Sequence, residues 1–169
     1  MIYIFDKKQA IIKVLTNDDF TAAHLNFKIN TATTFEFSLP ASKALPSGSK
    51  YVATPHPLND SKFIMLRLTE RVDKTETIEY SAYELAYQEL ATDGYIEDKR
   101  PRNQSALNLM KIALDGSNWE LNNVNVSGTE TTSFYYVDRL SAISKVVDRL
   151  GGEIVFYICL LYTSPSPRD

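Results

Sequence analysis

The residues best able to do chemistry are few and lie far apart in the sequence. Cys159 is the only cysteine, and the two histidines are His24 and His56. A zinc site needs several Cys, His or carboxylate ligands at close spacing, and a hydrolase needs a nucleophile beside a positioned base. These residues provide neither set. We therefore expect both histidines to be partly exposed residues of strands or loops.

Two pairs of carboxylates are adjacent in the sequence, Asp18 with Asp19 and Glu97 with Asp98. Catalytic carboxylates act at a controlled separation, whereas these pairs lie in loop-like sequence typical of a solvated surface. The chain also lacks the glycine-rich phosphate-binding motifs, the nucleophile elbow and the His-Glu-x-x-His motif. The sequence predicts no catalytic, cofactor-binding or metal-binding residue, and no cofactor.

Composition and charge argue against two further classes of protein. The 169 residues are 44% hydrophobic and 23% charged, with a net charge of −3. This predicts a globular chain of one or two domains, without the basic stripe that phosphate neutralisation demands. No run approaches the roughly 18 apolar residues of a membrane-spanning helix, and the start does not resemble a signal peptide. We expect neither sequence-specific nucleic-acid binding nor a membrane span.

Alternating apolar residues predict a β-rich domain over residues 1–82. The first 15 residues read as two short strands, and HLNFKIN and TFEFSLP as a hairpin that ends at Pro40. Phe35, Phe37 and Leu39 share its buried face. LPSGSK and TPHPLNDS are predicted loops around a short strand, YVA. FIMLRLTERV and TIEYSAY predict a second hairpin.

A change of pattern predicts a small α+β domain over residues 83–158. NQSALNLMKIALDGSNW is typical of a helix capped by Asn103 or Ser105 and ended by Gly116. WELNNVNV, TTSFYYV and EIVFY read as strands. DRLSAISKVVDRLGG predicts a helix between Asp138 and Gly151. The apolar stripes of the two helices are expected to bury Leu107, Met110 and Leu114 in the first, and Leu140, Ile143, Val146, Val147 and Leu150 in the second.

Tyrosines offer surface recognition as an alternative to catalysis. Tyr135 and Tyr136 are neighbours in a predicted strand, so one should point outward if the other points inward. Tyr83, Tyr87 and Tyr95 lie around the predicted domain boundary. These rings could form an exposed band at a subunit interface, or pack in the core with their hydroxyl groups reaching water. A binding or structural role is favoured over catalysis.

The order of segments resembles the N-terminal region of phage minor structural proteins, also called tail-associated lysins or prophage endopeptidase tail proteins. The resemblance rests on an opening pair of short strands followed by four segments: FKINTATTFEFSLPA, YSAYELAYQEL, QSALNLMKIALDGSNWEL and YVDRLSAISKVVDRLGGEIVFY. It implies an α+β fold, in which residues 1–82 form a tube-like barrel domain, incomplete in this chain. Residues 83–158 would be a small α+β domain inserted in that barrel.

The same resemblance implies a baseplate-hub-like homotrimer at the virion tail tip, made in the bacterial cytoplasm. Its expected partners are the distal tail protein, the tail tube and the tape measure protein. A region beyond this sequence would contact the host cell wall or a receptor. On this hypothesis the hub closes or continues the tail tube and has no chemistry of its own.

Two alternatives remain open. The chain could be the N-terminal part of a tail-associated peptidoglycan hydrolase, an endopeptidase or muramidase whose catalytic domain lies beyond the sequence. It could also be a module of a bacterial surface adhesin.

The last eleven residues, CLLYTSPSPRD at 159–169, fit neither domain. Translated back into codons, they resemble a transposase-end sequencing adapter joined to its primer site. We therefore expect residues 159–169 not to be native and the protein to be cut off within its second domain. A barrel that lacks its closing strands has unpaired edges, so residues 1–158 alone are expected to aggregate or to remain partly unfolded.

Overall fold

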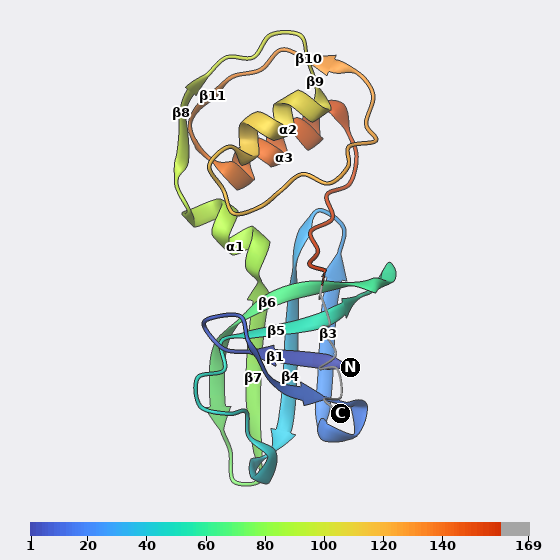
Figure 1. Cartoon of the computed structure of the whole chain (residues 1–169), viewed down its shortest axis with the longest axis vertical. Coiled ribbons are helices and arrows are strands. Elements are labelled where there is room, and N and C mark those ends of the chain that lie inside the picture. The colour runs from blue at the N-terminus through green and yellow to red at the C-terminus, as the bar shows by residue number, and fades with distance from the viewer. Residues whose placement is uncertain (160–169) are drawn as a thin grey trace, which may run out of the picture. The chain divides into compact units, whose positions relative to one another are not determined.

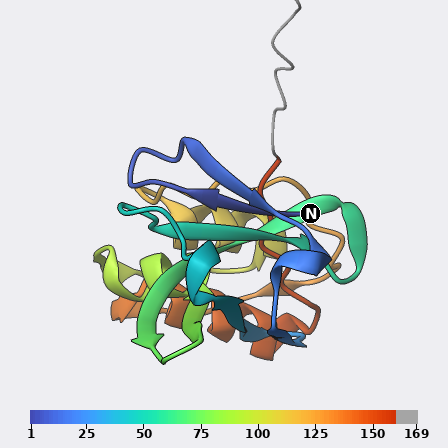
Figure 2. The same ribbon diagram turned by 90° about the horizontal axis from the view of Figure 1, so that it is seen from below.

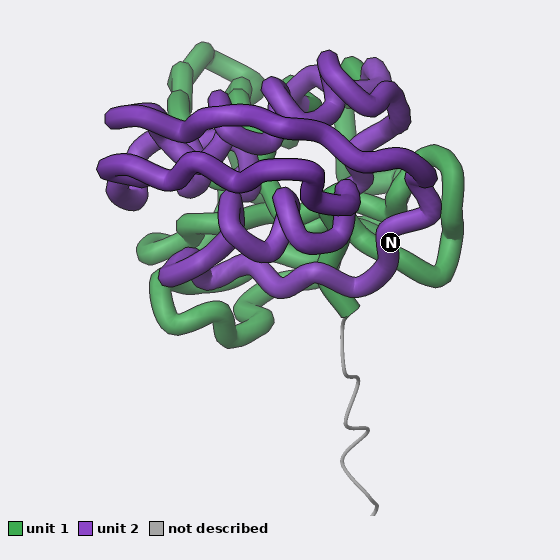
Figure 3. The backbone as a smooth tube through the Cα atoms, turned by 90° about the horizontal axis from the view of Figure 1, so that it is seen from above, with its two compact units in different colours: residues 1–27, 33–84, 156–169 green, residues 28–32, 85–155 purple. Residues whose placement is uncertain are grey.

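The computed structural model describes residues 1–159. Of the predicted adapter-derived segment, only Cys159 lies within the described residues. The chain divides into two compact units, shown in Figure 3. Of the described residues, unit 1 contains 1–27, 33–84 and 156–159, and unit 2 contains 28–32 and 85–155. The domain ranges expected from the sequence, 1–82 and 83–158, stay a prediction.

Unit 1 is built on an antiparallel sheet, in which the described residues form seven strands in the order β2-β1-β5-β6-β7-β4-β3. In Figure 2 the β1–β2 hairpin lies along β5. Two short 3₁₀ turns, at Asn17–Asp19 and Ala41–Lys43, follow β2 and β4. The strands are β1 (Ile2–Phe5), β2 (Ile11–Leu15), β3 (Ala22–Lys28), β4 (Thr31–Pro40), β5 (Tyr51–His56), β6 (Asn59–Asp73) and β7 (Thr77–Glu84).

The long strand β6 bends the sheet. Its first part pairs with β5 and its second part with β7, and the register shifts between Leu68 and Glu70. Such an irregularity kinks a strand and increases its twist. In Figure 1, β5 accordingly runs across the direction of β4 and β7. The sheet wraps around one core without closing into a barrel, and β2 and β3 form its two ends.

The core of unit 1 follows from alternation along the strands. Phe35, Phe37 and Leu39 of β4 are buried, as predicted. The Phe37 ring stacks on Phe35 with centroids 4.8 Å apart and on Tyr80 of β7 at 5.1 Å. Full burial of each such apolar side chain contributes about 1.5–3 kcal/mol, so β4 and β7 hold much of this core together.

One loop prediction in unit 1 was wrong. TPHPLNDS forms the end of β5, a tight turn at Pro57–Leu58 and the start of β6. Pro55 is tolerated because the β5–β6 register shifts directly after it, where the missing amide hydrogen costs least. The expectation for His56 was also wrong, because the residue is 2% exposed. Its Nδ1 accepts a hydrogen bond from the Leu58 amide at 3.1 Å.

Unit 2 combines three helices with short strands in its described residues. Figure 1 shows α2 and α3 side by side. The small side chains of Ala106, Ala113 and Ala142 are buried and allow the helix backbones to approach closely. The elements are α1 (Leu85–Thr92), β8 (Tyr95–Lys99), β9 (Gln104–Ser105), α2 (Ala106–Leu114), β10 (Thr129–Glu130), β11 (Phe134–Asp138) and α3 (Arg139–Leu150).

Helix α3 confirms its prediction. The Asp138 carboxylate accepts a hydrogen bond from the Ser141 amide at 2.8 Å, and Gly151 follows the last turn at φ 76°. Ile143 and Val146 are buried, and the outer members of the predicted stripe are half-buried. Helix α2 begins directly after Ser105, which is one of the two caps predicted from the sequence.

Other predictions for unit 2 were wrong. Helix α2 buries Leu109 with its alanines, whereas Leu107 is 42% exposed and Met110 and Leu114 are half-buried. The segments 119–126 and 153–157 form no strand. Both segments carry apolar residues, but no neighbouring strand in the described chain pairs with either of them, so neither forms a strand. The chain does return to the sheet of unit 1 at Ile158, which exchanges two backbone hydrogen bonds with Phe63.

The α+β fold class is confirmed, with a large antiparallel sheet and a few helices. Within residues 1–159, every helix is too short or too polar to cross a membrane.

Candidate interaction surfaces

The residues that could do chemistry lie apart in the structure. Among the described residues, no three His, Cys, Asp or Glu side chains come together as metal ligands would. His24 and Cys159 are exposed, and Asp98 forms an ion pair with Arg100 at 2.9 Å. That the chain has no catalytic, cofactor-binding or metal-binding residue stays a prediction.

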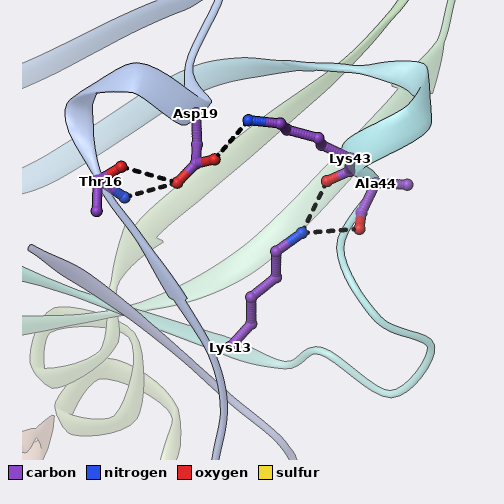
Figure 4. Close-up of polar contacts among 5 residues, drawn as sticks. All are labelled: Lys13, Thr16, Asp19, Lys43 and Ala44. Carbon is purple, nitrogen blue, oxygen red and sulfur yellow. Dashed lines mark hydrogen bonds and ion pairs between the residues drawn. The ribbon is translucent and has the colours of Figure 1, made fainter.

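Asp19 organises a polar cluster at the end of β2, drawn in Figure 4. Its carboxylate accepts hydrogen bonds from the Thr16 amide at 2.9 Å and the Thr16 hydroxyl at 3.0 Å, and it pairs with Lys43 at 2.8 Å. Lys43 first, and then Thr16, hold the pKa of Asp19 far below its usual range. Lys13 of β2 donates to the carbonyls of Lys43 and Ala44 at 2.9 and 3.2 Å. These bonds fasten the edge strand β2 to the segment after β4.

Glu84 is the one buried carboxylate of the described chain. It ends β7, is 4% exposed, and accepts a hydrogen bond from the Thr33 amide at 2.7 Å. Burial raises the pKa of Glu84, and the bond from Thr33 opposes the shift. The position is structural, because its bonding partner belongs to β4 and ties that strand to the end of β7.

Both ends of the sheet in unit 1 have an unpaired side. Among the described residues, β2 pairs only with β1, and β3 is the last strand at the other end. Ile11 and Val14 of β2 are 44% and 42% exposed. An edge strand presents free amide and carbonyl groups to which a further strand can add. Such edges suit assembly with other chains.

Unit 2 presents three tyrosines that contact one another on the outside of the β8–β11 pair. We call Tyr95, Tyr135 and Tyr136 the tyrosine patch. Their exposed fractions are 56%, 60% and 61%. Tyr136 stacks on Tyr95 with ring centroids 5.7 Å apart and meets Tyr135 edge-to-face at 4.8 Å.

Tyr135 and Tyr136 are both exposed, so neither ring packs in the core, and the exposed band is the one of the two expected arrangements that these residues adopt. Tyr136 has φ 46°, in the left-handed region, which interrupts the alternation of the strand. The neighbouring Phe134 fills the inner side and is fully buried. No sequence signal marks this conformation at a tyrosine. Of the other tyrosines considered, Tyr83 lies on β7 of unit 1 and Tyr87 is half-buried in α1.

Exposed aromatic side chains held against one another are typical of protein contact surfaces. Tyrosine supplies a large, rigid area with a polar tip, and it is enriched where proteins bind proteins. The tyrosine patch and the sheet edges therefore favour binding over chemistry.

Comparison with known proteins gives a match for part of unit 2. Residues 93–161 match the model of the prophage endopeptidase tail domain. No curated protein matches the chain.

The fold is similar to a solved prophage tail protein, gp18 of Listeria monocytogenes EGD-e. The TM-score is 0.60 at 14% sequence identity, over 91% of this chain and 47% of gp18. The chain thus spans about half the length of gp18.

A second solved structure is the E. coli c3393 protein, a component of the type VI secretion system described as structurally similar to the T4 bacteriophage tail proteins gp27 and gp5. Its TM-score is 0.46 at 13% identity, over 76% of this chain and 41% of c3393.

The resemblance that the sequence segments indicated is confirmed by the match over residues 93–161 and by the fold shared with gp18. Residues 93–161 of this chain are thus similar to the prophage endopeptidase tail domain, and its fold is similar to that of a prophage tail protein.

Proposed function

We propose that this chain belongs to a phage tail protein that is a hub at the tail tip, forms a homotrimer and closes or continues the tail tube. The observation that carries the proposal is the bent, open sheet of unit 1. Its two ends, β2 and β3, leave backbone donors and acceptors unpaired among the described residues. Strands from a further part of the protein or from neighbouring subunits would satisfy these groups and complete a tube wall.

The partners that follow from this role are the distal tail protein, the tail tube and the tape measure protein. Contacts with the host cell wall or a receptor would come from a region beyond this sequence. The tyrosine patch is our candidate for the contact between unit 2 and another copy of the chain in the trimer. Replacing Tyr135 and Tyr136 by serine should weaken the trimer, whereas Tyr83→Ser, an exposed tyrosine outside the patch, should not.

The location can be tested on assembled particles. A short epitope inserted at Gly48, in an exposed turn with open space around it, should leave the sheet intact. Gold-labelled antibody is expected at the tail tip of tagged particles, and untagged particles serve as the control. Labelling along the whole tail shaft, or label absent from particles that contain the tagged chain, would contradict a hub.

The second candidate is the N-terminal part of a tail-associated peptidoglycan hydrolase. Two observations favour it: the matched family is named for an endopeptidase, and the chain spans only about half of gp18. In our proposal this chain has no hydrolytic activity of its own, whatever the longer protein does. Incubation of the purified chain with Gram-positive cell walls should release no muropeptides. Release that persists after controls for contaminating enzymes would favour the hydrolase.

A further inference from the structure

A basic pocket lies in unit 2, apart from the tyrosine patch. Its volume is 340 Å³. Seven residues line it, all of them polar or charged: Arg100, Arg102, Thr131, Thr132, Ser133, Lys145 and Arg149. Four of the seven are cations and no carboxylate is among them, although the whole chain carries a net charge of −3.

Three segments distant in sequence build this basic pocket. The Thr132 amide donates to the carbonyl of Pro101 at 3.1 Å, and the Asn103 amide donates to the Thr131 hydroxyl at 2.9 Å. Helix α3 forms the third wall, where Lys145 donates to the Ser133 carbonyl at 2.7 Å. Because these contacts are made within unit 2, the lining is held in place without a ligand.

Most of the positive charge in the basic pocket is uncompensated. Arg100 pairs with Asp98, whereas Lys145 bonds only to a neutral carbonyl. In the part of the chain that the structure describes, Arg102 and Arg149 form no ion pair, and both are exposed. Free guanidinium groups near one another repel, so a ligand that carries negative charge would relieve this cost.

We propose that the basic pocket binds the phosphate group of a small hydroxylated molecule, a phosphate ester. A phosphate monoester carries a charge of about −1.5 to −2 and three terminal oxygens, which match several cations and a hydroxyl donor. A carboxylate has two oxygens and one charge, and a single arginine satisfies it. The pocket measures 340 Å³ and is open to solvent, so it has room for more than the phosphate group alone.

The rest of the ligand would face threonine, serine and charged side chains, which offer both polar groups and the carbon atoms of their stems. Duplex DNA needs an extended positive stripe, whereas these cations surround one hollow. This inference does not depend on the hub proposal.

The test is calorimetric titration of the purified full chain at constant ionic strength with glycerol 1-phosphate, inorganic phosphate and acetate. Glycerol 1-phosphate should bind most tightly, and acetate should not bind detectably. Equal affinity for inorganic phosphate would overturn an ester as the ligand. Equal affinity for acetate, or no heat with any phosphate, would overturn the phosphate site.

Two variants locate the binding. Arg102→Gln and Arg149→Gln should each weaken glycerol 1-phosphate binding about ten-fold, because each loses a charge-assisted bond. Lys111→Gln, an exposed α2 position outside the lining, makes the same charge change and should leave affinity unaltered. Circular dichroism confirms that the variants fold. An equal loss in all three variants, or tighter binding of a DNA duplex than of the ester, would overturn the proposal.

Discussion

The two units bury and expose different kinds of side chain. Unit 1 has a core of large aromatic and aliphatic residues from long strands, and all four buried polar or charged residues found in the described chain belong to it. Unit 2 has a smaller core rich in alanine, short strands and an irregular stretch from residue 118 to 128. On its surface are the tyrosine patch and the basic pocket.

This difference indicates that the two units contribute to stability and to binding in different ways. In unit 1, most large side chains pack in the core. The groups that can bond to other chains are the backbone amide and carbonyl groups of the edge strands. In unit 2, the exposed side chains of the tyrosine patch and the basic pocket are our proposed contacts with other molecules. Changes in the core of unit 1 should therefore act on stability, and changes on the surface of unit 2 should act on binding.

The largest effect is expected at the centre of the unit 1 core. Phe37→Ala removes a ring stacked on both Phe35 and Tyr80 and leaves a cavity. We expect a loss of about 3–5 kcal/mol in the free energy of unfolding. Urea denaturation followed by far-ultraviolet circular dichroism measures it. A loss below about 1 kcal/mol would contradict the comparison, since it would approach the ~0.5 kcal/mol range of surface substitutions.

A smaller effect is expected at the start of α3 in unit 2. Asp138→Ala removes the bonds to the amide and hydroxyl of Ser141. The expected loss is about 1 kcal/mol. Fluorescence of Trp119, the only tryptophan, follows the unfolding of unit 2. Asp138→Asn can still accept the amide bond and should lose less; an equal loss in both variants would contradict a capping role.

Glu84 makes the stability of unit 1 depend on pH. Its pKa is raised above 4.5 by burial, so the folded state holds a proton that the unfolded state has released. The free energy of unfolding should fall as pH rises from about 4.5 to the folded-state pKa. Glu84→Gln keeps an acceptor for the Thr33 amide and should remove this fall. A pH profile that is the same in the variant would contradict a buried, destabilising charge.

Asp19 should act in the opposite direction. The pKa of Asp19 is depressed in the folded state. Its contribution to the free energy of unfolding is therefore present above the ordinary pKa of 3.8 and is lost as the pH falls below that value. Asp19→Asn should lower the melting temperature at pH 7, and the difference from the unsubstituted chain should shrink on acidification. Asp18→Asn, at an exposed neighbour without a bonded partner among the described residues, is the matched control and should change little.

The smallest effect on stability is expected in the tyrosine patch. Tyr135→Ala should change the free energy of unfolding by no more than about 0.5 kcal/mol, because the side chain is 60% exposed. Phe134→Ala, one residue away and fully buried, should cost about 3–5 kcal/mol. Similar losses for the two variants would show that Tyr135 belongs to the core.

The sequence predicted the elements whose local pattern and capping agree with their packing. The alternation of Phe35, Phe37 and Leu39 marked β4, and Asp138 with Gly151 marked both ends of α3. Helix α1 was missed because β7 runs into it directly at Leu85, without a capping or turn residue between them. The segment 119–126 was wrongly predicted as a strand, since alternation alone cannot supply a partner strand.

The candidate surfaces were less visible in the sequence. The tyrosines could be named, but the exposure of both Tyr135 and Tyr136 depends on a positive φ that L residues rarely adopt. The basic pocket joins Arg100 and Arg102 to Lys145 and Arg149, more than 40 residues further along the chain. Only tertiary packing brings these groups together, and the sequence has no run of basic residues that would indicate the pocket.

The mass of the full-length gene product in solution tests the hub proposal most directly. Native mass spectrometry of that product, alone and with the distal tail protein, measures the number of copies in the assembly. We predict a trimer that binds the distal tail protein. A product that is folded and monomeric, and stays so with the distal tail protein present, would contradict the proposal that the open sheets of unit 1 assemble into a tube.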